Sequence, residues 1–416
     1  MNYSNPSNGY HLFELENGLR VIFSQSKKSM MVYCGILIGS GSRDENEKNN
    51  GVAHFIEHSV FKGTSKRRSF NLMNRLESVG GELNAFTTRE RTMYYTASLK
   101  KFFDRSMEIL TDIVFNPLFP PNEIEKEKKV IEEEIEMYED SAEESIYDDF
   151  YRHLFPDNSM GFNILGSRFT LTGIDRDCLQ HFWKQNYTTD NIVVSIAGGV
   201  TPDKVQRIIN KYLNDIPYSA ANRLRNSPNG VMPFNKSIDK EFQQTHCIIG
   251  KRAFSSNDDR KYALSVMNNL LGGDWMSSRL NLSVREKHAF AYNVHSSISF
   301  YSDCGTFLVQ WGTDEKNLDK SIELIQKELK RLREQNLSYL HLNRSKRQIL
   351  SQYAMIQENP SAVMQFKGKN ILDYNRIITE TEFFKKINEV STSDILDVAN
   401  EVLEKDSLSL LVYKND

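Results

Sequence analysis

The sequence has little of several features that would place it in a specialised class of protein. It has four cysteines, widely spaced at Cys34, Cys178, Cys247 and Cys304 with no Cys-x-x-Cys pair, so we expect free thiols in a reducing compartment. No apolar run approaches the roughly 18 residues that a membrane helix needs. The N-terminal stretch lacks the basic and apolar regions of a signal peptide. These absences predict a cytoplasmic chain with no membrane partner.

The chain also lacks a strong charge of either sign. Lys and Arg total 52 and Asp and Glu total 55, which gives a formal net charge of −3. We therefore expect no nucleic-acid partner and no general attraction to anionic surfaces. The hydrophobic fraction of 39% and the charged fraction of 26% are those of an ordinary globular protein. A length of 416 residues is sufficient for two to four domains with a substantial core.

The first half of the chain alternates between strand-like and helix-like patterns. An Asn-Gly turn within residues 10–24 predicts a pair of strands. Apolar runs with the strand or the helix period predict the other elements. Beyond that pair, we expect strands at 32–40, 83–99 and 191–198, and helices around His54 and at 70–79, 101–114, 122–154 and 201–213.

A similar succession returns after residues 215–238, which are rich in Asn, Ser and Pro and are the best candidate for a linker. Two α+β halves of about 200 residues each indicate a duplicated fold. We expect an N-terminal domain at 1–214 and a C-terminal domain of the same fold at 239–416. In the second half the expected strands are 245–250, 305–312 and 408–413, and the expected helices are 259–271, 318–333, 340–356 and 391–403.

The strongest chemical signal is the stretch from Gly51 to Thr64, which holds His54, Glu57 and His58 in an H-x-x-E-H order. A helix turns about 100° per residue, so the two histidines lie one turn apart on the same face, with the glutamate beside them. Two neutral imidazoles can bind one Zn²⁺, and the adjacent carboxylate can take a proton from water. The pattern predicts a metal site. The alternative is an apolar helix that carries three polar groups by chance.

A catalytic zinc site needs a third protein ligand, and the acidic segment 122–154 offers several. Glu127 and Glu134 are seven residues apart, so they lie on nearly the same helical face. The residues alone do not choose among the acids, because a run of acids is usually a solvated face. The candidates are Glu125, Glu127, Glu132, Glu133, Glu134, Glu136 and Glu139.

Further segments accompany the histidine motif in order along more than 80 residues. They are Phe-Lys-Gly-Thr64, Glu82-Leu-Asn-Ala-Phe-Thr87 and Glu127-x-x-Val-Ile-x-Glu-Glu-Ile135. With these segments the chain resembles the inverzincin peptidases, the family of pitrilysin, insulin-degrading enzyme and mitochondrial processing peptidase. The resemblance implies a zinc-dependent endopeptidase that acts on peptides or unfolded segments in an enclosed cavity, with one Zn²⁺ per chain.

The resemblance also implies the roles of individual residues. His54, His58 and Glu134 would bind the zinc ion, and Glu57 would activate the water. Glu127 matches a further family glutamate that supports the site from behind the metal ligands. Asn84 and Ala85 match the strand edge that pairs with an extended peptide substrate, although from the residues alone this segment is an ordinary strand.

The segment from Leu270 to Tyr292 resembles the family's C-terminal signature, in which an Arg and a Tyr seven residues apart face the zinc ion. Those positions are Arg285 and Tyr292, which would bind the substrate carbonyl and stabilise the developing oxyanion. Burial habits alone predict a surface arginine and a core or strand tyrosine.

This segment departs from the family pattern in two places. Ala289-Phe290 replaces the usual Gly-Leu, which is expected to reshape that turn. Gly272 and Gly273 stand where the zinc-free subunit of mitochondrial processing peptidase has a much longer glycine-rich loop. Presequence trimming of the mitochondrial kind is therefore not expected.

The family's architecture implies two homologous α/β-sandwich repeats, each a mixed and largely antiparallel sheet with helices packed on it. Together they would form one bowl-like half of a peptidase chamber. The chain retains both the zinc motif and the Arg/Tyr pair, so the economical arrangement is a homodimer. In it, Arg285 and Tyr292 of one chain would complete the zinc site of the other. The alternative is a non-catalytic or partner-dependent subunit of a processing-peptidase-like complex.

Overall fold

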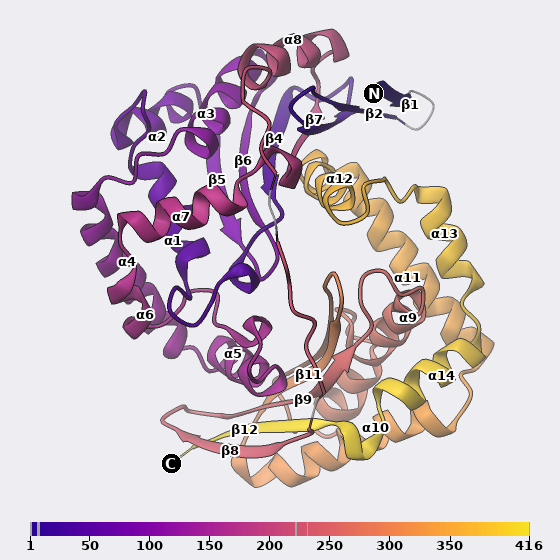
Figure 1. Cartoon of the computed structure of the whole chain (residues 1–416). Helices are drawn as coiled ribbons and strands as arrows, with labels where there is room; N and C mark the ends of the chain where they lie inside the picture. Colours follow the sequence, from indigo (N-terminus) through magenta and orange to yellow (C-terminus); the bar gives the residue numbers. More distant parts are fainter. Residues whose placement is uncertain (1, 6–8, 221–222, 231, 416) are drawn as a thin grey trace. The chain divides into compact units, whose positions relative to one another are not determined.

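The structure is a computed structural model that describes residues 2–5, 9–220, 223–230 and 232–415 (Figure 1). None of the helices in these ranges is long and apolar enough to cross a membrane. The chain forms two compact units, each with its own sheet. The first unit comprises Met1–Glu136, Phe162–Arg225 and Met355–Thr379, and the second comprises Met137–Gly161, Asn226–Ala354 and Glu380–Asp416.

The first unit is built on a seven-stranded sheet in the spatial order β1-β2-β3-β7-β4-β6-β5. Strands β3 and β7 are parallel, and all other neighbours are antiparallel. Strand β7 is buried along its whole length, as its continuous apolar run predicts. The strands are β1 (Asn2–Asn5), β2 (Tyr10–Glu14), β3 (Arg20–Gln25), β4 (Met31–Ile38), β5 (Glu82–Thr87), β6 (Thr92–Leu99) and β7 (Ile192–Gly198).

The second unit is built on a five-stranded sheet in the spatial order β10-β11-β9-β12-β8. Strands β12 and β8 are parallel, and the other neighbours are antiparallel. The strands are β8 (Asn235–Lys240), β9 (Thr245–Ala253), β10 (Asn293–Phe300), β11 (Gly305–Thr313) and β12 (Ser409–Asn415).

Helices cover both sheets. In chain order they are α1 (Val52–Ser59), α2 (Ser69–Glu77), α3 (Phe103–Phe115), α4 (Pro121–Glu139), α5 (Ala142–Leu154), α6 (Arg168–Gly173), α7 (Arg176–Asn186), α8 (Pro202–Leu213), α9 (Lys261–Gly272), α10 (Leu318–Glu334), α11 (Tyr339–Glu358), α12 (Pro360–Tyr374), α13 (Glu380–Glu389) and α14 (Thr392–Val402).

The two sheets repeat one topology. The order β3-β7-β4-β6-β5 of the first sheet matches the order β8-β12-β9-β11-β10 of the second, and the single parallel pair has the same place in both. The prediction of a duplicated α+β fold with mixed, largely antiparallel sheets is therefore confirmed. Helix α9 follows β9 in the second unit as α1 follows β4 in the first.

Each sheet is also covered by a helix from the other half of the sequence. Helix α5 packs against β9 and β12 of the second sheet, and α12 packs against β3, β4 and β7 of the first (Figure 1). The α12 contact is close at Gly368, where an added Cβ would lie 2.7 Å from Leu37 and 2.9 Å from Ser195. Asp373 of the same helix accepts two hydrogen bonds from Arg91, at 3.1 and 2.9 Å. Each compact unit thus combines segments that are distant in the sequence.

Part of the expected linker is structured. Arg225 donates two hydrogen bonds to Asp44, both at 2.8 Å, and β8 begins at Asn235. The domain boundaries expected from the sequence, 1–214, 215–238 and 239–416, stay a proposal for the limits of the two repeats.

Two predicted elements are wrong in extent. Residues 83–99 form two strands, β5 and β6, because Thr88 and Arg91 close a hairpin turn with a backbone hydrogen bond of 2.7 Å. The acidic segment 122–154 forms two helices, because the extended Ser141 interrupts it. Glu143 and Glu144 then begin α5, where acids stabilise a helix N-terminus. The sequence patterns did not predict β10, α6, α7, α12 or α13.

Arg285 lies in a π-helical turn, Asn281–Glu286, and Ala289 just beyond it has a φ of +51°. This left-handed conformation costs an L-residue about 1–2 kcal/mol, whereas glycine adopts it freely. Ala289 thus takes a conformation that glycine adopts freely, and the expected reshaping of the turn stays a prediction.

Replacing Ala289 with glycine is expected to stabilise the second unit. The side chain is exposed, so its loss leaves no cavity, and relief of about 1 kcal/mol of strain corresponds to a rise in Tm of about 2–4 °C. Calorimetry measures this shift. The matched control is Ala291→Gly, which removes a buried methyl group and is expected to lower Tm. A fall in Tm for Ala289→Gly would contradict the strain assignment.

Candidate metal centre

The start of α1 is fixed by a glycine and a buried carboxyl group. Gly51 has a φ of +96°, and an added Cβ would lie 2.7 Å from the carbonyl oxygen of Leu165, so no other residue fits without strain. The buried Glu45 carboxyl accepts hydrogen bonds from the backbone N–H groups of Gly51 and Ala53, each at 2.8 Å. These bonds satisfy two donors that a helix N-terminus leaves free. The backbone that carries His54 is thereby held in place.

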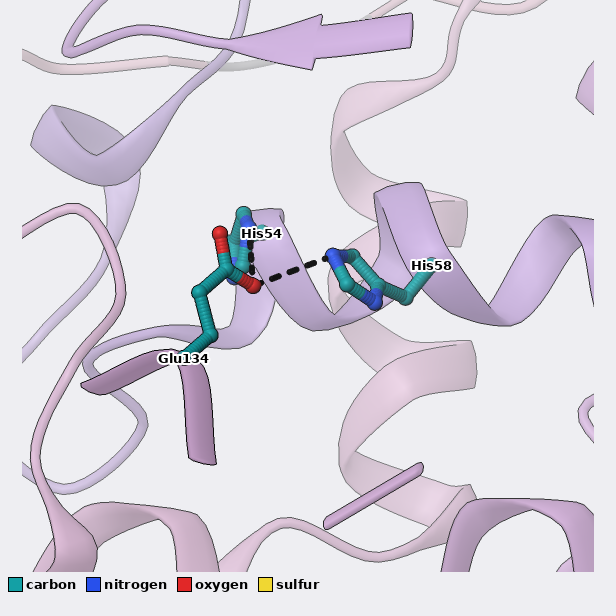
Figure 2. Close-up of side chains that lie close together, drawn as sticks. All are labelled: His54, His58 and Glu134. Carbon is teal, nitrogen blue, oxygen red and sulfur yellow. Dashed lines mark ion pairs between the residues drawn. The ribbon is translucent and has the colours of Figure 1, made fainter. Parts of the chain in front are cut away.

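The two histidines of α1 meet one glutamate of α4. Figure 2 shows the Glu134 carboxylate between the imidazoles of His54 and His58, with its Oε2 3.7 Å from Nε2 of His54 and 3.5 Å from Nε2 of His58. The possible ligand atoms of the three residues all lie within 4.8 Å of one another. Among the described residues, these three are the one such group of His, Cys, Asp or Glu side chains.

This donor set fits a zinc ion. Around a tetrahedral Zn²⁺ with bonds of about 2.0–2.2 Å, ligand atoms lie about 3.3–3.6 Å apart, close to the two separations between Glu134 and the histidines. His54 is 6% exposed. Burial, and then the neighbouring His58, lowers the pKa of His54 to about 3, so its imidazole is neutral and has a lone pair for a metal.

Glu127 holds His58 through the other ring nitrogen. Its Oε1 lies 2.8 Å from Nδ1 of His58, and its Oε2 lies 2.6 Å from Nζ of Lys62. Burial acts to raise the pKa of Glu127, but the hydrogen bonds from His58 and Lys62 outweigh it and hold that pKa below its usual value. Because an ionised carboxylate only accepts, Nδ1 of His58 carries the hydrogen and Nε2 is left for a metal.

A proton competes with a metal at His58. Burial lowers the pKa of His58, but the hydrogen bond and charge of Glu127, with the charges of Glu134 and Glu57, raise it above its usual value. A cation is therefore favoured at this position, whether it is a proton or a metal ion.

Glu57 lies beside this group of three side chains and is not part of it. Its Oε2 accepts a hydrogen bond of 2.6 Å from the hydroxyl of Thr87. Burial raises the pKa of Glu57 above its usual value, and the nearby charge of Glu134 adds to the rise. A carboxylate with a raised pKa is a stronger base near neutral pH. The site thus combines a metal-type donor set with an adjacent base.

Asn84 and Ala85 lie on β5, the edge strand of the first sheet. The backbone N–H of Ala85 donates to Oδ1 of Asn84 at 2.8 Å. It therefore points to the open edge and not to β6. An outward donor of this kind can pair with an added strand.

Arg285 and Tyr292 belong to the second unit. The side chain of Arg285 is 44% exposed and lies 4.0 Å from a carboxylate oxygen of Glu286, as expected of a surface arginine. Tyr292 is 68% exposed and lies just before β10, so the expectation of a core or strand aromatic is wrong. Both side chains are available to a ligand, and their role at the metal centre stays a prediction.

Sequence reasoning missed three residues of the site. Lys62 and Thr87 lie inside the segments that carried the family resemblance, so their place in those segments was the available signal. Glu45 contacts α1 only through the fold, and no sequence pattern marks it.

A duplicated α+β fold with a His-His-Glu group and an adjacent carboxylate in its first repeat defines a class of zinc peptidases. Residues 20–168 match the family described as Insulinase (Peptidase family M16), and residues 173–349 match the Peptidase M16 inactive domain. The chain is 32% identical to zinc protease YmxG of Bacillus subtilis over 401 residues, which cover 96% of this chain and 97% of that protein. The chain belongs to peptidase family M16.

Other relatives agree with this assignment. The beta subunit of mitochondrial-processing peptidase from Saccharomyces cerevisiae is 28% identical over 424 residues, covering 98% of this chain and 91% of that protein. The fold matches the crystal structure of a protease from Helicobacter pylori with a TM-score of 0.89 and 20% identity, covering 97% of this chain and 99% of that chain.

Removing the Glu127 side chain is expected to weaken zinc binding. Without it, the ring of His58 loses the acceptor that fixes its orientation, and such losses reduce metal affinity by about 10–100-fold. Competition with a chromophoric chelator measures the Kd of Glu127→Ala. The control is Glu132→Ala, which removes an exposed acid from the same helix and is expected to leave the Kd unchanged. Equal affinities for the two variants would contradict the role of Glu127.

Proposed function

We propose that this chain is a zinc-dependent endopeptidase that hydrolyses peptides or unfolded polypeptide segments. The observation that carries the proposal is the meeting of His54, His58 and Glu134 beside Glu57. Membership of family M16 and the zinc-protease name of the Bacillus relative support it. A zinc ion bound by these three side chains would polarise the scissile carbonyl and lower the pKa of a water molecule toward neutrality.

Glu57 moves the proton in this reaction. Its carboxylate accepts a proton from the attacking water and then gives it to the leaving amine. Its position beside the ligands, and not among them, keeps it available for this task. Glu127 keeps Nε2 of His58 directed to the metal throughout, because its own bonds are to Nδ1 and to Lys62.

The edge of β5 binds the substrate as an added strand. A peptide carbonyl would replace Oδ1 of Asn84 as the acceptor for the Ala85 N–H. Backbone pairing of this kind gives affinity without strict demands on the substrate's sequence. It therefore suits unfolded segments of varied composition.

Arg285 and Tyr292 stabilise the oxyanion that develops on the substrate carbonyl. A guanidinium and a phenol both donate hydrogen bonds, and such donors act strongly where water is excluded. We assign them in trans, so that two chains in a homodimer each supply these side chains to the other's zinc ion. Two chains paired in this way would also enclose the cavity.

Removal of zinc and replacement of Glu57 are expected to have different effects. A chelator should abolish cleavage of an unfolded peptide, and added zinc should restore it. Glu57→Gln should retain one zinc ion per chain and lower kcat by about 10²–10⁴-fold, because the base is lost while the ligands remain. The matched control is Glu133→Gln, at an exposed position of α4. Zinc-loaded protein without chelator-sensitive cleavage would contradict the proposed function.

Coexpression of two inactive variants tests the homodimer. Glu57→Gln lacks the base, and Arg285→Ala lacks the oxyanion donor. A mixed dimer would contain one intact site if Arg285 acts in trans, so random pairing is expected to restore about a quarter of wild-type activity. The control pairs each variant with Glu57→Gln/Arg285→Ala, which supplies neither group. A coexpressed mixture that stays inactive, or a monomer of full activity, would contradict the assignment.

A partner-dependent subunit is the second candidate function. It is favoured by the likeness to a protein named as one subunit of mitochondrial-processing peptidase. Purified chain that binds zinc, cleaves nothing alone and becomes active with a second related chain would support this candidate over the homodimer.

A further inference from the structure

The carboxylate of Glu57 is held by one threonine. Thr87 ends β5 and pairs with Thr92 across the hairpin, and its Oγ1 lies 2.6 Å from Oε2 of Glu57. In the described part of the chain, this is the one hydrogen bond that reaches the Glu57 side chain. Oε1 of the same carboxylate is left for another partner.

The direction of this hydrogen bond follows from the neighbouring groups. Thr92 donates its hydroxyl proton to the carbonyl oxygen of Ser40 at 2.9 Å, and a carbonyl can only accept. Thr92 therefore has no proton for Thr87, whose Oγ1 lies 3.5 Å away. The proton of Thr87 is directed to Oε2 of Glu57, a carboxyl oxygen that accepts it.

The hairpin restricts the conformation of the Thr87 side chain. A β-branched side chain in a strand has a restricted χ1, and the buried Thr92 fixes the register beside it. By contrast, the terminal torsion of a glutamate is broad. A hydrogen bond to a charged group favours one orientation by about 10–100-fold.

We propose that Thr87 is a positioning residue for the general base. Its hydroxyl fixes Oε2 of Glu57 so that Oε1 is the oxygen that takes the proton from water. This inference rests on the proposed peptidase function. It adds a residue whose hydroxyl acts through Glu57 and not on the metal ligands.

Three variants test this role. Thr87→Val keeps the shape and removes the hydroxyl, and it is expected to lower kcat by about 10–100-fold with KM unchanged. Thr87→Ser restores the donor and is expected to recover kcat to within a few-fold of the wild type. Thr88→Val is the control, because the Thr88 hydroxyl bonds to Arg91 in the same hairpin and does not reach Glu57. This control is expected to keep the wild-type kcat.

Zinc affinity is the readout that does not depend on activity. The Kd from chelator competition is expected to be the same for the wild type and all three variants, because Thr87 contacts no metal ligand. A weakened Kd in Thr87→Val would show a structural role and overturn the proposal. So would a wild-type kcat in Thr87→Val, or a Thr87→Ser variant as slow as Thr87→Val.

The outcomes also separate this inference from the proposed function. Wild-type protein that binds zinc but cleaves no peptide would contradict the proposed function. Thr87 would then have no reaction in which to act. Active wild-type protein with an unimpaired Thr87→Val variant contradicts the role of Thr87 alone.

Discussion

The hydrogen bond between Glu127 and Nδ1 of His58 is the interaction on which the site depends. It fixes the tautomer and the ring of His58 and leaves Nε2 to meet Glu134. It also keeps a buried carboxylate ionised within a group of three acids, Glu57, Glu127 and Glu134. Lys62 offsets one of these charges, and a bound cation would offset more. The cluster therefore suits the proposed divalent metal ion.

The duplicated topology places different residues at equivalent positions of the two repeats. The interval between β4 and β5 holds His54, Glu57 and His58, and the equivalent interval between β9 and β10 holds Arg285 and Tyr292. Helix α9 takes the place of α1 in the second repeat, but it is an apolar helix with no His, Cys, Asp or Glu. The second repeat therefore retains the scaffold without metal-binding residue types in this helix, and the donor role of Arg285 and Tyr292 stays a proposal.

Periodicity in the sequence was sufficient to predict the elements that have a single strong hydrophobic pattern. The apolar strands β4 and β7, and the spacing of His54 and His58, were readable because burial imposes a regular repeat. Strand β10 was missed because its serines interrupt the alternation at a sheet edge. Helix α12 was not predicted because its residues, including Gly368, pack closely against a sheet that comes from the other half of the chain.

Some residues of the site were predictable from the sequence, and others were not. Spacing alone gave the two histidines and Glu57, whereas Glu134 was chosen among the acids through the family resemblance, and the structure brings it to the histidines. Lys62 and Thr87 contact residues distant in the sequence, whereas Glu45 bonds to backbone groups six and eight residues away. None of these contacts leaves a periodic pattern. The family segments marked Lys62 and Thr87, and only the folded chain reveals Glu45.

Anomalous diffraction at the zinc edge from zinc-loaded crystals tests whether His54, His58 and Glu134 hold a zinc ion. One strong peak per chain is expected, within about 2.0–2.2 Å of Nε2 of His54, Nε2 of His58 and a carboxylate oxygen of Glu134. A peak at other residues, or no peak at these three in a zinc-replete crystal, would contradict this expectation.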